Sequence, residues 1–267
     1  MHNHARQQIR RHSGHWQERL AAARRVGIVG VPPLEMIRFL NDRNMALLDL
    51  DAMLVKADLE TASQLIPRVY CAILRTVVVN ALHLDLDAIV VDVGPGKCDA
   101  AFHVAAILEE SLEIPVIRAE NRDNDNFGTP IARGRMPLLE KLLRITEGVK
   151  RVSPDPEPPL ACEPTAGFWG VPPRDFSILE LFPDTTHVYG WSRCMENKTP
   201  AAHELEAHVN TTVPTVFFAQ SFCAKTALAR YLAARHPRAL YLDVDVHTTG
   251  SAKAKIEAFL ELSGVAR

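Results

Sequence analysis

Hydrophobic residues in this chain fall into short, nearly continuous runs, separated by longer stretches in which apolar positions recur with helical spacing. The clearest run is DAIVVDV at residues 87–93, which is typical of a strand buried on both faces of a parallel sheet. Further predicted strands cover residues 26–31, 45–50, 114–118, 186–190, 215–218 and 239–244. Predicted helices cover residues 34–40, 62–82, 99–112, 135–147, 224–234 and 252–262. This alternation predicts a doubly wound α/β fold.

The second half of the chain repeats landmarks of the first. The segment GIVGVPPLE at residues 27–35 returns as GFWGVPPRD at residues 167–175. Two cysteines follow each copy, separated by similar lengths of chain: Cys71 and Cys98 in the first half, Cys194 and Cys223 in the second. The predicted fold class is therefore α/β, with two duplicated flavodoxin-like (Rossmann-like) lobes whose parallel sheets face each other across a cleft.

The domain boundaries follow from changes in composition. We expect an N-terminal helical extension at residues 1–26, a first α/β lobe at 27–152, a Pro-rich linker at 153–160 and a second α/β lobe at 161–267. The linker contains four prolines within SPDPEPP, and such a segment cannot continue a helix or a central strand. The extension is rich in Arg and His, which predicts a solvated polar helix or, alternatively, an element that docks a partner.

Composition and charge exclude several classes of protein. With 267 residues, 47% of them hydrophobic, the chain can bury a sizeable core. The formal charge of −2 gives no case for a nucleic-acid partner. No apolar run reaches the roughly 18 residues of a membrane span, and the N-terminus lacks the apolar core of a signal peptide. We therefore expect a soluble, cytoplasmic protein, in which five cysteines are free, catalytic or metal-bound.

The cysteines are the strongest candidates for chemistry. Cys98 and Cys223 each follow a predicted strand and open a predicted helix, which places them where open α/β folds bind ligands and where thiolates are favoured. Cys71 and Cys194 form a second pair in less similar contexts. Cys162 has no counterpart and is either a spare ligand or, as we prefer, a buried residue. Four thiolates suit zinc or an iron–sulfur cluster, and the lack of a C-x-x-C pair favours the cluster. The alternative is that these residues are small buried hydrophobes.

Several segments together point to a family. They are PPLE near the start, DAIVV before Cys98, IPV at residues 114–116, SFC at 221–223 and the closing GSAKAKIEAFLE at 250–261. In this order they resemble the subunits of 2-hydroxyacyl-CoA dehydratases and benzoyl-CoA reductases. The resemblance implies a [4Fe-4S] cluster between flavodoxin-like domains, with Cys71, Cys98 and Cys223 as ligands and Cys194 as a candidate fourth.

The same resemblance implies a reaction. Related subunits transfer single low-potential electrons to an acyl-CoA or other small organic substrate, after an ATP-dependent activator or another electron donor supplies them. A homodimer or heterodimer is also expected. The chain is short for such a subunit, so it is left open whether it is an enzyme by itself or a non-catalytic cluster- or tetrapyrrole-related accessory protein.

Two further groups are predicted to contact the cofactor. Gly94 and Gly96 flank Pro95 in a loop that resembles a phosphate loop but has Cys98 where a Ser or Thr would follow the lysine. Nucleotide hydrolysis is therefore not expected there, although the loop's N–H groups can bind cluster sulfurs or an anion. Trp191 and Arg193 lie with Arg174 in the opening loops of the second lobe. The arginines can clamp a carboxylate or phosphate, while the tryptophan shields the site or packs the seam between the lobes.

A rival interpretation rests on the segment LDVDVH. Asp243, Asp245 and His247 alternate along a predicted strand end, as in zinc- or manganese-dependent hydrolases of the deacetylase and arginase type. Those enzymes often carry a second histidine directly after the first, whereas Thr248 stands here. The remaining alternative is a strand end whose polar residues enter a loop.

Overall fold

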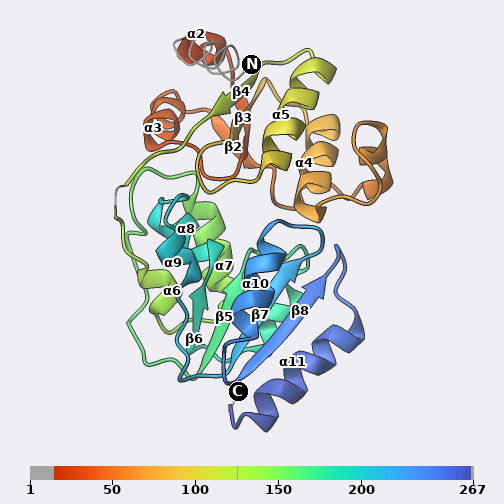
Figure 1. Ribbon diagram of the computed structural model, residues 1–267. Helices are drawn as coiled ribbons and strands as arrows, with labels where there is room; N and C mark the ends of the chain where they lie inside the picture. Colours follow the sequence, from red (N-terminus) through yellow and green to blue (C-terminus); the bar gives the residue numbers. More distant parts are fainter. Residues whose placement is uncertain (1–14, 125, 266–267) are drawn as a thin grey trace.

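The computed structural model describes residues 15–124 and 126–265, which form two lobes stacked end to end (Figure 1). Each lobe has one four-stranded, all-parallel sheet, with the order β2-β1-β3-β4 in the first and β6-β5-β7-β8 in the second. The first sheet consists of β1 (Arg25–Val29), β2 (Ala46–Asp49), β3 (Ala88–Asp92) and β4 (Val116–Ala119). The second consists of β5 (Ala166–Gly170), β6 (Thr186–Tyr189), β7 (Thr215–Gln220) and β8 (Ala239–Val244). The predicted α/β fold with two Rossmann-like lobes is confirmed.

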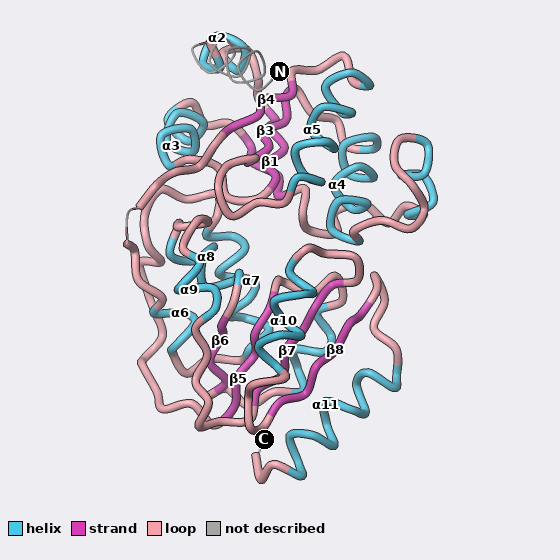
Figure 2. Tube along the Cα trace, viewed as in Figure 1, coloured by secondary structure: helices cyan, strands magenta, loops and turns pink. Residues whose placement is uncertain are grey.

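Helices cover the faces of both sheets, as Figure 2 shows. The first lobe carries α2 (Trp16–Leu20), α3 (Leu34–Asp42), the 3₁₀ turn η1 (Leu59–Gln64), α4 (Ala72–His83) and α5 (Asp99–Ser111). The remaining elements are α6 (Pro130–Arg133), α7 (Leu138–Gly148), η2 (Phe176–Leu181), α8 (Trp191–Asn197), α9 (His203–Ala207), α10 (Lys225–Ala233) and α11 (Gly250–Leu262). Because Pro67 lies between η1 and α4, the predicted helix at 62–82 is divided, and Cys71 caps its second part.

Burial explains why the strand signals in the sequence are so continuous. Every residue of β3 is buried, as is every residue of β5, β6 and β7, because helices pack on both faces of each sheet. One hydrophobic cluster contains Val31 from the first lobe together with Phe168 and Val171 from the second. The two lobes therefore share part of a core.

The helices α6 and α7 belong to the second lobe, whereas the sequence assigned the helix at 135–147 to the first. The carboxylate of Glu196 accepts hydrogen bonds from the N–H groups of Ile131 and Ala132, at 2.7 and 3.0 Å. The buried ammonium of Lys141 in α7 donates to the carbonyl of Thr186 in β6. The chain therefore crosses between lobes after β4, and the Pro-rich segment at 153–160 connects α7 to β5 within the second lobe.

The predicted N-terminal helix is described from residue 15 onward, and its earlier part lies outside the described residues. There it is the short helix α2, whose Trp16 packs edge-on against Phe39 with ring centroids 4.9 Å apart. In the described part of the chain, no helix is long and apolar enough to cross a lipid bilayer.

Candidate functional site

A cavity of about 360 Å³ lies between the lobes, where the loops that follow the strands of one sheet meet those of the other. Its size falls in the range of about 300 to 1,000 Å³ that is usual for small-molecule sites. The first lobe contributes Gly30, Asp49, Asp51, Cys71, Asp92, Gly96, Lys97 and Cys98 to the lining, and the second contributes Arg174, Trp191, Met195, Cys223 and Lys225. This is the position expected for a site in an open α/β fold.

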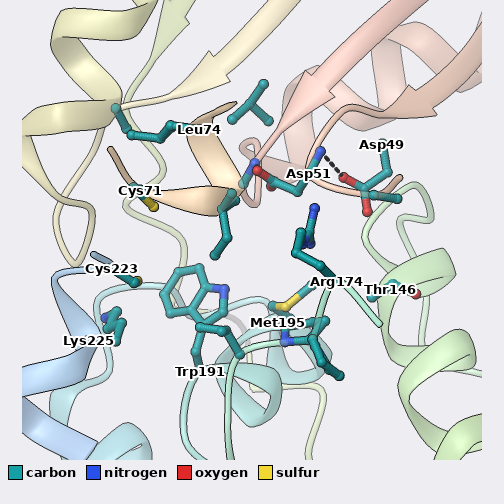
Figure 3. A pocket seen from close by; sticks show the side chains of 18 of the residues that line it. Asp49, Asp51, Cys71, Leu74, Thr146, Arg174, Trp191, Met195, Cys223 and Lys225 are labelled. Carbon is teal, nitrogen blue, oxygen red and sulfur yellow. Dashed lines mark hydrogen bonds between the residues drawn. The ribbon is translucent and has the colours of Figure 1, made fainter. Parts of the chain in front are cut away.

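Three thiols line this cavity. Cys71 is the N-cap of α4, Cys98 is the N-cap of α5, and Cys223 stands two residues before α10. Figure 3 shows Cys71 and Cys223 on the same side of the cavity although they come from different lobes. Their backbones also meet, because Ala72 N–H donates to the carbonyl of Ser221 at 3.4 Å.

A hydrogen bond between the side chains of Cys71 and Cys223 shifts the pKa values of both. Cys223 donates a hydrogen bond to the Cys71 sulfur, which lowers the pKa of Cys71 to about 7 although burial opposes this shift. The same hydrogen bond, together with burial, raises the pKa of Cys223. The Cys71 thiolate is therefore accessible near neutral pH, and the thiolate is the form that binds metals.

Cys194 lies away from the cavity. It sits inside α8, one turn after the helix begins, with its Sγ 3.7 Å from the carbonyl of Ala202. Burial raises its pKa to about 12, so it stays a neutral thiol. At the first position of α8 the chain has Trp191, which does line the cavity. The spacing of cysteines in the sequence correctly paired the two helices α4 and α8. However, Cys71 lies at the start of α4, whereas Cys194 lies about one turn inside α8.

The other predicted site residues divide between the cavity and the protein interior. Gly96 and Trp191 line the cavity, whereas Gly94 packs against the backbone of Asn121. Arg193 is 3% exposed and donates to Thr129 Oγ1 at 3.4 Å, outside the cavity. Cys162 also lies elsewhere, with its Sγ 3.9 Å from Nε2 of His187, and it is half-buried rather than buried as expected.

Two lysines and one indole join the lobes at the cavity wall. Lys97 forms an ion pair with Asp92 at 3.0 Å, and its Nζ lies 3.9 Å from the ring centre of Trp191. Lys225 lies 4.7 Å from the same ring and pairs with Glu206 at 2.6 Å. The indole thus meets one cation from each lobe, and such cation–π contacts strengthen when they are desolvated.

A buried charged group occupies the side of the cavity opposite Cys71 and Cys223 (Figure 3). Asp51 accepts the Gly30 N–H at 2.7 Å, and Asp49 accepts the Asp51 N–H at 3.0 Å. Arg174 follows the repeated Pro-Pro motif and extends toward both aspartates. Burial raises the pKa of Asp49 to about 7, with a further contribution from Asp51, and burial also raises the pKa of Asp51.

Asp49→Asn is expected to stabilise the protein more at pH 8 than at pH 5. The pKa of Asp49 is about 7 in the folded protein and about 3.9 in an unfolded chain, so its contribution to stability is full below pH 4 and is lost as the pH rises to 7. Asparagine avoids this loss, and we expect a gain of about 1 to 3 kcal/mol at pH 8. Urea unfolding at both pH values measures it. Asp85→Asn, whose side chain is 91% exposed, is the control, and an equal effect of Asp49→Asn at both pH values would contradict the assignment.

Sequence reasoning missed the two aspartates, although a signal was present. Asp49 and Asp51 alternate at the end of a predicted strand, which is where ligands bind in such folds. Lys97 was considered only as part of a phosphate loop. Its contacts with Asp92 and Trp191 depend on how the lobes meet, and no local pattern indicates them.

The residues of the rival hydrolase site do not converge. Asp243 accepts a hydrogen bond from Ser221 Oγ at 2.7 Å on the exposed side of β8, and Asp245 and His247 follow it at the surface. Among residues 15–124 and 126–265, no three His, Cys, Asp or Glu side chains are arranged to hold a metal ion. The three cavity thiols are therefore not arranged around a single point.

Comparison with models of known protein families and with curated proteins found no match. No relative therefore indicates a substrate or a reaction for this chain. The basis for a functional assignment is the interlobe cavity, which is lined by three thiols and by a buried arginine and two aspartates that lie opposite Cys71 and Cys223.

Proposed function

We propose that this chain is an iron–sulfur protein that holds a [4Fe-4S] cluster at Cys71, Cys98 and Cys223. In this proposal it serves low-potential electron transfer to a small organic or acyl-CoA substrate, as in the 2-hydroxyacyl-CoA dehydratase and benzoyl-CoA reductase subunits that its sequence resembles. The observation that carries the proposal is that three thiols, supplied by loops of two lobes, line one cavity.

The arrangement of the thiols suits a cluster better than a single ion. A zinc ion requires every thiolate within about 2.3 Å of one point, and the described residues contain no such group. The ligands of a cluster bind separate iron atoms and therefore lie farther apart. Three cysteines also leave one iron of a four-iron cluster without a protein thiolate, and Cys194 is buried inside α8.

The surroundings of the thiols fit a negatively charged group. Lys97, Arg174 and Lys225 bring three cations to the cavity wall. Lys97 and Lys225 are paired with Asp92 and Glu206, so Arg174, whose Nε and Nη1 have no acceptor, is the cation left to offset the charge of the thiolates. The Trp191 indole and neighbouring apolar side chains restrict water. When bound, a cluster in such a site supplies single electrons, and its reduction potential depends on burial and nearby charge.

The proposal assigns the supply of electrons to a partner. The loop at residues 94–98 lacks the Ser or Thr that a nucleotide-binding phosphate loop needs after its lysine. An ATP-dependent step would therefore take place on a separate activator or other donor. The role of this chain is to bind the cluster, limit its exposure to water and hold the substrate beside it.

Anaerobic reconstitution with ferrous iron and sulfide tests the proposal. The desalted protein should retain about four iron and four sulfide per chain and show broad absorbance near about 400 nm that bleaches on reduction. A chain that retains no more iron than a serum albumin blank would refute the proposal. A colourless protein that gains hydrolase activity with added zinc or manganese would also refute the proposal.

A further inference from the structure

The guanidinium of Arg174 lacks the partners that a buried arginine normally has. Its Nε and Nη1 atoms are buried, and within the described part of the chain neither has a hydrogen-bond acceptor. The residue lines the interlobe cavity. A guanidinium has five N–H donors in a planar fork, and buried donors of this kind are nearly always paired. The cavity is therefore where the missing acceptor would enter.

The nearby aspartates do not fill this role. The Asp51 carboxylate accepts the Gly30 N–H and the Asp49 carboxylate accepts the Asp51 N–H, so the two strand-end groups are held by backbone. They interact with Arg174 through charge without a hydrogen bond to it. The backbone of Arg174 is held in place, because its backbone N–H donates a hydrogen bond to Oε1 of the buried Gln220 side chain at 3.1 Å.

Much of the remaining cavity wall is apolar, and Figure 3 shows that Leu74 lies on the side of Cys71, across the cavity from Arg174. The apolar lining includes Ile73, Leu74, Leu143, Val171, Phe176 and Met195, together with the Trp191 ring. These side chains come from α4, α7, η2, α8 and the loop after β5, so both lobes contribute. A ligand with a charged head at Arg174 and an apolar body along this wall would reach toward the thiols on the opposite side.

We propose that Arg174 binds the carboxylate of a small organic acid whose apolar body lies against Leu74, Met195 and Trp191. A carboxylate matches the planar fork with two parallel hydrogen bonds. It also carries a single charge, which suits a site beside two aspartates better than the double charge of a phosphate. The inference names the substrate class of the same cavity, and its catalytic meaning rests on the proposed function, whereas binding itself does not require iron.

Binding should take up a proton. Asp49 faces Asp51, Arg174 and Lys150, and Asp51 also faces Lys97 and the Cys71 thiol. A carboxylate brought beside these groups favours the neutral forms of the aspartates, because three anions around Arg174 repel one another. Affinity should therefore increase roughly three- to tenfold between pH 8 and pH 6.

Isothermal titration calorimetry with the purified full-length chain tests the inference. The probes are 4-methylpentanoate and the neutral amide of the same shape, 4-methylpentanamide. In the wild type the acid should bind at least about tenfold more tightly than the amide, since charge-assisted bidentate hydrogen bonds exceed neutral ones by this order. Arg174→Gln should reduce the ratio to about one. Arg174→Lys, which keeps the charge without the fork, should give an intermediate ratio.

The ratio of acid to amide within one variant does not depend on the fraction of folded protein. Arg122→Gln is the matched control, since Arg122 is 69% exposed and pairs with Glu120, and it should leave the ratio unchanged. Equal affinities for acid and amide in the wild type, or a ratio unchanged in Arg174→Gln, would overturn the inference. Because the titration is made with iron-free protein, these outcomes are independent of cluster reconstitution.

Discussion

Replacing Cys71, Cys98 or Cys223 with alanine is expected to abolish the retention of reconstituted iron and sulfide, while Cys194→Ala retains both. Each of the three variants removes one thiol from the cavity, and the other two cysteines, Cys162 and Cys194, do not line it. Loss of a ligand should weaken iron binding by more than about 100-fold, because the loss of a mere supporting contact already weakens metal affinity roughly 10- to 100-fold. Iron analysis and the absorption spectrum after desalting measure the effect.

The Cys194→Ala variant is a demanding control because it makes the same chemical change at a fully buried thiol. It removes a sulfur that packs near Ala202 and should cost some stability without changing iron content. Cys162→Ala, outside the cavity, is a second control. Iron that is lost from Cys194→Ala but kept by Cys98→Ala would contradict the assigned ligands, and circular dichroism establishes that each variant is folded.

Gly96→Ala is expected to destabilise the protein by about 2 to 4 kcal/mol and to weaken iron retention. Gly96 has φ +83°, a conformation that costs other residues about 1 kcal/mol or more. A Cβ at this position would lie 2.0 Å from the carbonyl oxygen of Pro200 in the opposite lobe. The backbone cannot yield as a flexible side chain would, so the loop that carries Cys98 must move away from the second lobe.

Gly148→Ala is the control for this prediction. Gly148 ends α7, and an added Cβ would meet nothing within 4 Å, so the same substitution should be neutral or slightly stabilising. Urea unfolding gives the difference in stability, and reconstitution gives the difference in iron. If Gly96→Ala is as stable as Gly148→Ala, the loop is free to move and the lobes are not held at this contact.

The sequence pattern predicted the central strands well because they are buried along most of their length, whereas the edge strands β2 and β8 are largely half-buried or exposed. A continuous apolar run such as DAIVVDV can pack against helices on both faces of a sheet. The observed strands β3 and β7 are accordingly buried along their whole length. The helix α7 was predicted at nearly its observed residues, but the sequence assigned it to the first lobe, whereas it packs in the second. Its apolar stripe shows that it covers a sheet, but it does not show which of two similar sheets is covered.

The cysteines also show which features local sequence predicts and which depend on tertiary structure. Cys98 and Cys223 were placed at the carboxyl ends of strands from local order alone, and the structure brings them to one cavity. Counting residues between paired cysteines suggested Cys194 as well, but Cys71 is the N-cap of α4 whereas Cys194 is the fourth residue of α8. Cys194 is therefore displaced along its helix from the strand-end loop into the core, and Trp191 at the first position of α8 lines the cavity.

The sequence by itself determined the class of the protein: two parallel α/β units, joined in one chain, with polar and thiol-bearing loops at the strand ends. That information is local, because a strand buried on two faces appears in the sequence as an apolar run, and the turn after it appears as Gly, Pro or polar residues. Only the tertiary structure decided which loops share a cavity and that Asp49, Asp51 and Arg174 lie opposite the thiols. The physical reason is that contacts between lobes depend on their relative orientation, which no segment of sequence encodes alone.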